Sequence, residues 1–297
     1  MKNERELHGD FAGRVAIVTG AGAGLGRSYA RLLAKHGARL VVNDLAVRAD
    51  GTSAAEMVAR EIQADGGEAI ANLASVTDPA AMESAVAVAH ERWGRVDILI
   101  NNAGILRDSS FAKMSLDDFR AVLDVHLMGS VICTKAVWNL MRQQAYGRIV
   151  MATSSSGLYG NFGQANYGSA KMALVGLMQT LSIEGERSDI RVNCIAPTAG
   201  TAMLDGLLPD GVMKQLDPDL VSPGLLALVG TDAPTRTILC AGAGHFAQAF
   251  VTLTEGLRLE DATARTVAEH WSAIGDRRGE TVPGSGRALI ELELSTR

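Results

Sequence analysis

The sequence predicts one α/β domain, residues 1–297, in which a doubly wound parallel sheet of about seven strands (Rossmann-like) is followed by a C-terminal extension. Short apolar runs without period-two alternation recur along the chain, as expected of strands buried on both faces. Helical segments separate these runs, and a glycine-rich turn follows the first of them. We assign residues 13–244 to the core of the domain and residues 245–297 to the extension.

The first predicted strand, residues 14–19, runs directly into the glycine-rich turn. The turn reads T-G-x-x-x-G-x-G, and a helix is predicted over residues 27–36. This order lets backbone N–H groups at the start of a helix approach a pyrophosphate, although a glycine turn alone can also be a plain tight connection. The turn residues predicted to bind a dinucleotide are Gly20, Gly24, Leu25 and Gly26.

The second predicted strand, residues 39–44, ends in a carboxylate. Asp44 lies eighteen residues after Gly26, where an acid can bind both hydroxyls of an adenosine ribose and repel a 2′-phosphate. Asp44 therefore favours NAD as the cofactor. The alternative is that Asp44 only caps the loop that follows.

The next two βα units repeat the pattern. A helix is predicted over residues 53–64, a third strand over 68–73, and a helix over 79–93 with Asp78 as its N-cap. The fourth strand, residues 96–100, ends in Asn-Asn-Ala-Gly, whose amides can support the cofactor turn by hydrogen bonds. The residues assigned to this role are Asn102, Ala103 and Gly104.

The second half of the core continues the alternation. Its predicted elements are a helix over 115–144 that contains His126, a strand over 147–153, a helix over 164–186, a strand over 190–195 followed by Pro197 and Thr201, and a seventh strand over 237–241. The extension carries one predicted helix over 262–274. Ligands of such sheets bind at the carboxyl ends of the strands, where all the candidate residues fall.

Three side chains at this edge of the sheet indicate a site for proton transfer. Tyr167 and Lys171 are four residues apart and project from one face of the predicted helix, so the ammonium can lower the pKa of the phenol. Ser154 can hold a carbonyl or alkoxide oxygen while Tyr167 moves its proton. The alternative is an ordinary exposed i, i+4 pair without chemistry.

Composition excludes several classes of protein. Hydrophobic residues make up 47% of the chain and the net charge is −5, with no dense basic run, so we expect no nucleic-acid partner. No uninterrupted apolar run approaches the length of a membrane span, and we expect no membrane partner. The three cysteines and six histidines show no metal-ligand spacing, so we expect no metal and a reducing compartment.

At this point the sequence resembles the short-chain dehydrogenase/reductase family over residues 13–244. TGAGAGLG, NNAG, Ser154 and YGSAK occur in the family's order. Within it the chain is most similar to the (3R)-hydroxyacyl-CoA dehydrogenase domains of type 2 multifunctional enzymes, a group also called 17β-hydroxysteroid dehydrogenase type 4. The segments AGAGLGR, VNDL, NNAGILRD, GLYGNFGQANY and IAPTAG carry that similarity.

The resemblance assigns roles to individual residues. It implies that Tyr167 is the acid/base, that Ser154 orients the substrate oxygen, and that Lys171 binds the nicotinamide ribose and lowers the pKa of Tyr167. His126 stands where most members have an asparagine of a proton relay. It also implies further contacts to the cofactor from Ser75, Val76, Pro197 and Thr201, with Ser75 in place of a common aspartate.

The expected activity is NAD-dependent interconversion of a secondary alcohol and a ketone. The resemblance implies (3R)-3-hydroxyacyl-CoA or a steroid derivative as the small-molecule substrate. Alternatives are a 3-oxoacyl-acyl-carrier-protein reductase, for which Arg27 near the turn could serve NADPH, a free 17β-hydroxysteroid dehydrogenase, or a non-catalytic dinucleotide-binding protein. Candidates for the apolar walls of the substrate site are Leu106, Tyr159, Phe162, Met203 and Leu204.

Assembly and location are expectations as well. The apolar residues of helices 115–144 and 164–186 include alanine, glycine and methionine, and the family pairs these helices about a two-fold axis. We expect a homodimer or homotetramer. The chain ends in Ser-Thr-Arg without a peroxisomal signal, which predicts a stand-alone cytoplasmic enzyme.

Overall fold

The computed structural model describes residues 11–200 and 210–295. The chain forms two compact units, one up to Gln248 and one from Ala249 onward, which are described separately.

The first unit is built on an eight-stranded sheet with the order β3-β2-β1-β4-β5-β6-β7-β8. The strands are β1 (Val15–Thr19), β2 (Arg39–Asn43), β3 (Ala69–Asn72), β4 (Ile98–Asn101), β5 (Gly147–Ala152), β6 (Ile190–Thr198), β7 (Ile238–Gly242) and β8 (His245–Ala249). All six pairings from β3 to β7 are parallel. The predicted doubly wound parallel fold is therefore confirmed.

The eighth strand was not predicted. β8 follows β7 after two residues, Ala243 and Gly244, both with positive φ, so the two strands form a hairpin. Most of β8 is exposed, and its sequence HFAQA lacks the apolar run by which the buried strands were recognised. It begins at residue 245, in the segment that we had assigned to the extension.

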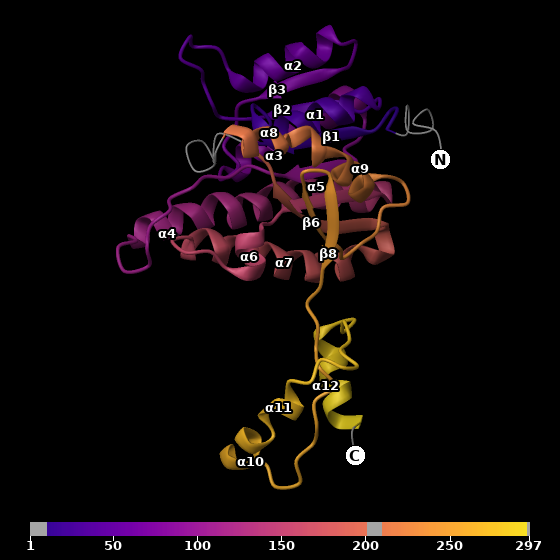
Figure 1. The fold of residues 1–297 in the computed structure, drawn as a ribbon. Helices are drawn as coiled ribbons and strands as arrows, with labels where there is room; N and C mark the ends of the chain where they lie inside the picture. The colour runs from indigo at the N-terminus through magenta and orange to yellow at the C-terminus, as the bar shows by residue number, and fades with distance from the viewer. Residues whose placement is uncertain (1–10, 201–209, 296–297) are drawn as a thin grey trace. The chain divides into compact units, whose positions relative to one another are not determined.

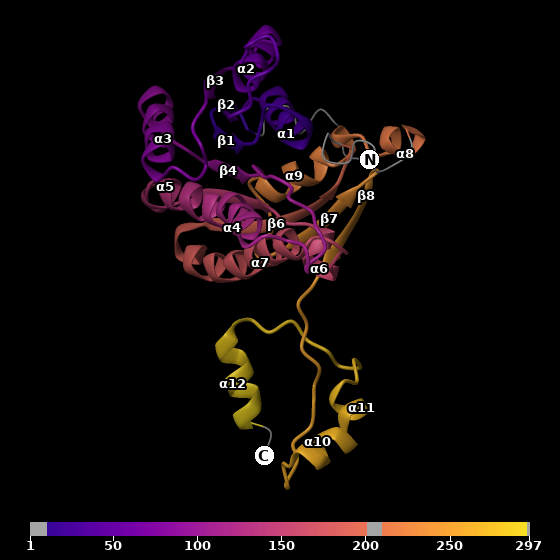
Figure 2. The same ribbon diagram turned by 90° about the vertical axis from the view of Figure 1, so that its left-hand side faces the viewer.

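Helices cover both faces of the sheet (Figures 1 and 2). On one face lie α1 (Gly24–Lys35), α2 (Ala54–Ala64) and α9 (Ser222–Val229); on the other lie α3 (Pro79–Trp93), α5 (Gly129–Gln144) and α7 (Ala165–Gly185). Short elements join them: α4 (Leu116–Leu123), α6 (Ser155–Tyr159), η3 (Glu186–Ser188), α8 (Asp210–Gln215) and η5 (Pro218–Leu220). α1 packs against α9 although they are far apart in sequence (Figure 2).

Local sequence signals set several helix ends. The Asp78 side chain accepts a hydrogen bond from the backbone N–H of Ala81 at the start of α3, which confirms the predicted N-cap. Gly94 ends α3 in the left-handed conformation. Ser53 caps α2 in the same way as Asp78 caps α3. These caps satisfy backbone groups that the helices themselves leave unpaired.

The long helix predicted over residues 115–144 is interrupted. A π-helical turn, η2 (Asp124–Met128), separates α4 from α5, and the backbone N–H of Gly129 bonds to the carbonyl of Asp124. The run Leu116–Gln144 is apolar enough, by length and composition only, to cross a membrane, and 39% of its most apolar window is buried. Buried helices of soluble proteins pass the same test, and α5 packs against α3 and β4.

The second unit contains α10 (Ala264–Glu269), α11 (Trp271–Ile274) and α12 (Gly286–Ser295), with an antiparallel bridge between Leu253 and Thr281. The helix predicted over residues 262–274 is present as α10 and α11. Neither of these two helices has a buried residue. Exposed apolar side chains of the unit are Phe250, Val251, Leu257, Trp271, Val282, Leu289, Ile290, Leu292 and Leu294.

Candidate active site

The glycine turn forms a cradle at the start of α1. Gly20 and Gly24 have positive φ, and a Cβ on Gly26 would lie 2.1 Å from the carbonyl oxygen of Gly20. Ala23, the N-cap of α1, makes no side-chain hydrogen bond, so no cap side chain occupies the first N–H groups of the helix. This close, uncapped backbone fits the pyrophosphate of a dinucleotide.

Asp44 is held beside the cradle by two backbone groups. Its Oδ2 accepts a hydrogen bond from the N–H of Gly22, and its Oδ1 accepts one from the N–H of Ala46, both at 2.8 Å. A Cβ on Gly22 would lie 2.9 Å from the carboxylate. Gly22 was missed as a site residue, although it is one of the alternating glycines of the turn. Asp44 thus caps the loop that follows β2, as the alternative interpretation expected, and also lies at the glycine turn.

Thr19 ties the turn after β4 to the glycine turn. Its Oγ1 accepts hydrogen bonds from the N–H groups of Asn102 and Ala103, at 3.0 and 3.1 Å. The Asn102 side chain in turn donates to the carbonyls of Thr19 and Gly20. Sequence reasoning missed Thr19; its place directly before the first glycine of the motif was the available signal.

The proposed catalytic side chains come from the end of β5 and from α7. Ser154 caps α6, and its hydroxyl lies close enough to the Tyr167 phenol to lower the pKa of that phenol. The Lys171 ammonium donates to the carbonyl of Ala152 and lies 5.4 Å from the centroid of the Tyr167 ring. Thr153, which was not predicted, donates to the carbonyl of Lys171 at 2.6 Å and so fixes α7 against β5. The structure thus brings Ser154, Tyr167 and Lys171 together.

Burial is the main cause of the pKa shifts of Lys171 and Tyr167. It lowers the pKa of Lys171 to about 7. It also raises the pKa of Tyr167, against a smaller opposing effect of the Ser154 hydrogen bond. The direction for Tyr167 differs from the sequence expectation, because burial of the phenol outweighs the interaction that lowers its pKa. Burial therefore shifts Lys171 towards its neutral form.

His126 lies beside Tyr167, on the π-helical turn. It is buried, with 2% of its surface exposed, and its ring stands edge-on to the Tyr167 ring at 5.2 Å between centroids. Burial lowers the pKa of His126 to about 3, so the imidazole is neutral. Its Nε2 meets the backbone of Ile105, whereas Nδ1 has no hydrogen-bond partner among the described residues.

A pocket of about 250 Å³ joins the cradle to His126, Tyr167 and Lys171, whereas Ser154 does not line it. Its lining residues are Gly20, Ala23, Gly24, Leu25, Gly26, Asp44, Asn102, Gly104, His126, Ala152, Thr153, Tyr167, Lys171 and Pro197. The glycine turn therefore lines the same cavity as Asp44, Tyr167 and Lys171. This continuity is what a hydride transfer between a dinucleotide and an alcohol requires.

Other predicted site residues lie outside this pocket. Ser75 and Val76 follow β3, where Ser75 bonds to Thr77 and Val76 is buried near Gly129. Tyr159 ends α6 and Phe162 lies between α6 and α7; their side chains are 73% and 89% exposed and do not line this pocket. Ala103 and Leu106 flank the pocket residue Gly104 in the chain without lining the cavity. Thr201, Met203 and Leu204 lie outside the described residues.

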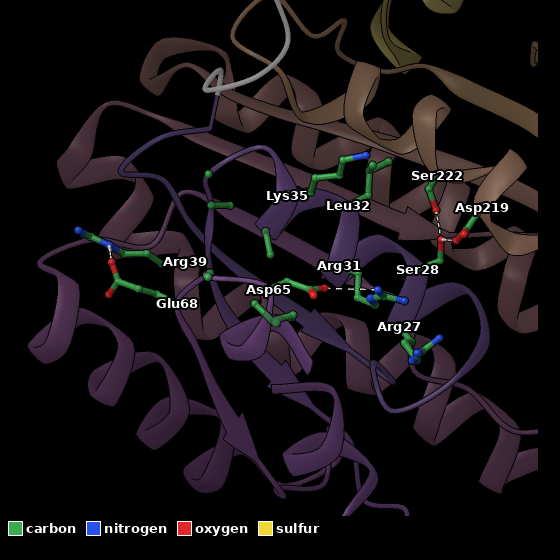
Figure 3. Close-up of a pocket in the computed structure, with 16 residues that line it drawn as sticks. Arg27, Ser28, Arg31, Leu32, Lys35, Arg39, Asp65, Glu68, Asp219 and Ser222 are labelled. Atoms are coloured by element: carbon green, nitrogen blue, oxygen red, sulfur yellow. Dashed lines mark hydrogen bonds and ion pairs between the residues drawn. The ribbon is translucent and has the colours of Figure 1, made fainter. Parts of the chain in front are cut away.

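Arg27 belongs to a different cavity. A groove of about 790 Å³ runs along α1 between α2 and the start of α9 (Figure 3). Arg27 lines this groove and pairs with Glu61 at 2.9 Å, and Arg31 pairs with Asp65 one turn further along. Arg27 does not line the pocket at the glycine turn, so its guanidinium is committed to a carboxylate on the outer face of α1.

The family comparison agrees with this site. The model described as short chain dehydrogenase matches residues 14–209. The chain belongs to the short-chain dehydrogenase/reductase family. It is accordingly an oxidoreductase that acts on CH–OH donors, with a dinucleotide-binding Rossmann-like domain.

Individual relatives narrow the likeness. The chain is 52% identical to peroxisomal multifunctional enzyme type 2 of Drosophila melanogaster, over 95% of this chain and 49% of the relative. The full-length structure of that enzyme superposes with a TM-score of 0.80, at 39% identity, over 96% of this chain and 50% of the other. The chain thus spans about half the length of this relative. The resemblance to this group seen in the sequence is confirmed.

A second solved structure is matched by this chain over almost its whole length. It is 7α-hydroxysteroid dehydrogenase complexed with NADH and 7-oxo glycochenodeoxycholic acid. It superposes with a TM-score of 0.73, at 30% identity, over 84% of this chain and 99% of that one.

Proposed function

We propose that the chain is an NAD-dependent dehydrogenase that interconverts (3R)-3-hydroxyacyl-CoA and 3-ketoacyl-CoA, including thioesters with a steroid-derived acyl group. The observation that carries this proposal is the continuous pocket from Asp44 and the glycine turn to Tyr167 and Lys171. The likeness to multifunctional enzymes named hydratase-dehydrogenase-epimerase supports the thioester substrate.

The chain's own residues supply binding and proton transfer. When bound, the nicotinamide supplies the hydride acceptor for alcohol oxidation. Ser154 donates a hydrogen bond to the substrate oxygen, and Tyr167 takes the hydroxyl proton in oxidation and returns it in reduction. In its protonated form Lys171 stabilises the phenolate of Tyr167, and its ammonium can bind ribose hydroxyls. Ser154 and Lys171 are buried and Tyr167 is half-buried, and the low local polarity strengthens these interactions.

Steady-state kinetics with defined substrates test the function. The panel contains both enantiomers of a medium-chain 3-hydroxyacyl-CoA and a free 17β-hydroxysteroid, each with NAD⁺ and with NADP⁺, and a 3-oxoacyl-acyl-carrier protein with NADH or NADPH. We expect turnover of the R thioester. Turnover of the S enantiomer alone would overturn the stereochemistry. Efficient oxidation of the free steroid without thioester activity would make the protein a steroid dehydrogenase, a class represented among its structural relatives.

Cofactor choice is the first prediction. We expect NAD(H) to be preferred over NADP(H), because a 2′-phosphate would meet the Asp44 carboxylate, which two backbone N–H groups hold in place. Arg27 offers no compensation, since it pairs with Glu61. Asp44→Ala should lower the ratio of kcat/KM with NAD⁺ to kcat/KM with NADP⁺ by about tenfold, equivalent to about 1.4 kcal/mol.

The matched control is Asp65→Ala, which removes a carboxylate from the outer face of α1 and α2. This substitution should leave the ratio of kcat/KM with NAD⁺ to kcat/KM with NADP⁺ unchanged. Comparable efficiency of the wild-type enzyme with NAD⁺ and NADP⁺ would reject the proposed role of Asp44.

Assembly as a homodimer or homotetramer is also proposed. Supporting features are the exposed Met172 and Ile183 on α7, and the exposed apolar side chains of the second unit. We expect light scattering at micromolar concentration to give a mass of two or four chains of 31.2 kDa each. A monomeric mass would contradict the proposal.

A reducing compartment, the cytoplasm, is proposed as the location. All three cysteines are free thiols. Fluorescence microscopy of the tagged chain in its own cell tests this, and a signal confined to an organelle would reject it.

A further inference from the structure

Asn166, the residue directly before Tyr167, is completely buried. Its exposed fraction is 0%, although asparagine is mostly found at protein surfaces. Burying an amide costs free energy unless its oxygen and its nitrogen both find hydrogen-bond partners. The Asn166 amide has a partner at each of these atoms, and the two partners belong to different segments of the chain.

The amide oxygen of Asn166 accepts a hydrogen bond from the backbone N–H of Tyr167 at 2.7 Å. The first N–H groups of a helix have no partner within the helix, and a side chain at the N-cap usually satisfies one of them. Gln164, the N-cap of α7, makes no such bond, because its amide donates to Asp108 instead. Asn166 thus supplies the missing cap for the N–H of Tyr167 itself.

The amide nitrogen of Asn166 connects α7 to the segment that follows β4. It donates to the carbonyl of Arg107 at 2.9 Å. Arg107 lies three residues after Gly104, which lines the cofactor pocket. One side chain thus holds both the backbone of the proposed proton carrier, Tyr167, and the backbone that continues from the pocket wall.

Two other hydrogen bonds join the same segments. The backbone N–H of Ser109 donates to the carbonyl of Gly163 at 2.9 Å, and the Gln164 amide donates to Asp108 at 2.6 Å. The bond between Gln164 and Asp108 is exposed, so water competes with it and it holds the segments weakly. Asn166 is the member of this group that is completely buried and that contacts the backbone of Tyr167 directly.

We infer that Asn166 is a positioning residue that fixes the backbone of Tyr167 against residues 104–109 and thereby sets where the phenol stands in the pocket. The inference rests on the proposed dehydrogenase function. Tyr167 lies in the first turn of α7, so a shift of that turn would move the phenol. The competing explanation is that the Asn166 amide only fills space beside Tyr167.

Two substitutions separate these explanations. Asn166→Leu keeps nearly the shape of asparagine without its hydrogen bonds, whereas Asn166→Ala removes the shape as well. Because misplacement by about 1 Å can cost about 100-fold in rate, positioning predicts that both variants lower kcat by about tenfold to hundredfold. If the amide only filled space, Asn166→Leu would stay within about threefold of wild type while Asn166→Ala lost activity, and that result would overturn the inference. Near-normal turnover of both variants would overturn it as well.

Hydrogen exchange gives a readout that needs no substrate. Mass spectrometry follows the backbone N–H groups of residues 105–110 and 163–168 in the wild-type protein and in both variants. Loss of the two Asn166 hydrogen bonds should speed exchange in both segments by about fivefold or more, because each segment loses a tie to the other. Faster exchange confined to residues 163–168 would show that the amide does not hold the two segments together, and would reject the inference.

NADH binding distinguishes positioning from a general loss of structure. The glycine cradle lies on β1 and α1, so calorimetry should give both variants a Kd for NADH within about threefold of wild type. Circular dichroism melting checks that each variant is folded at the assay temperature. A loss of NADH affinity as large as the loss of kcat would contradict a role confined to Tyr167.

Asn161→Ala is the matched control. Asn161 precedes α7 in the same loop but is exposed, and its amide donates to the Gln164 side chain at 3.1 Å. This variant should keep kcat and the exchange of both segments within about twofold of wild type, as is usual for surface substitutions. If the wild-type enzyme failed to oxidise 3-hydroxyacyl-CoA, the substrate proposal would fall, while hydrogen exchange would still test the role of Asn166.

Discussion

Replacing Tyr167 by phenylalanine is expected to lower kcat by about two to four orders of magnitude, the usual contribution of general acid–base catalysis. The substitution keeps the ring that packs edge-on against His126 and removes only the proton that is transferred. Stopped-assay kinetics at saturating NAD⁺ measure the loss, and calorimetry should show NADH binding within about threefold of wild type, since the cradle lies on other elements.

The pH profile adds a second criterion. Alcohol oxidation needs the deprotonated phenol, and burial raises the pKa of Tyr167, so wild-type oxidation should increase as pH rises above neutrality. Residual activity in Tyr167→Phe should lack that rise. Tyr29→Phe is a suitable control, because the buried Tyr29 hydroxyl has no hydrogen-bond partner among the described residues. Near-normal turnover of Tyr167→Phe would reject its assignment.

Gly26→Ala should have the second large effect. The added methyl group would stand 2.1 Å from the Gly20 carbonyl oxygen, and neither backbone can move without opening the cradle. We expect NADH affinity to fall by about tenfold to hundredfold and stability by about 1–3 kcal/mol, the range for overpacking. Calorimetric titration and urea unfolding measure the two losses separately.

Gly176→Ala is the matched substitution. Gly176 lies on the helix α7, and a Cβ there meets no atom within 4 Å. Alanine in place of a helical glycine should stabilise the fold by about 0.5–1 kcal/mol without altering NADH binding. Tight NADH binding by Gly26→Ala would show that the cofactor does not use the glycine turn.

The sequence predicted the sheet well because buried parallel strands leave a strong local signal. Residues 15–18 are an apolar run with no exposed member, and the same pattern identifies β2 and β4. The glycine turn and Asp44 were predictable for a related reason: their backbone geometry and charge admit few other residues. The spacing of Tyr167 and Lys171 needed only the helical repeat.

What the sequence could not predict depended on side-chain direction and on contacts between distant segments. Arg27 follows the glycine turn directly, yet its guanidinium turns to Glu61, a partner 34 residues away. Tyr159 and Phe162 are as apolar as pocket residues but are exposed. Burial of Lys171, which decides the proton affinity of the site, comes from packing of α7 on β5 and β6.

The π-helical turn makes the helical run from Leu116 to Gln144 a helix with two registers. Each residue of an α-helix turns the chain by about 100°, so one extra residue rotates everything after it by that angle. α4 buries Val122 and packs against α7, whereas α5 buries one face and packs against α3 and β4. Removing one residue would give a more regular helix, but α4 and α5 could then no longer both face their partners, and the imidazole of His126 would move. The irregular turn therefore fixes the direction of the helix after it and the position of the His126 side chain.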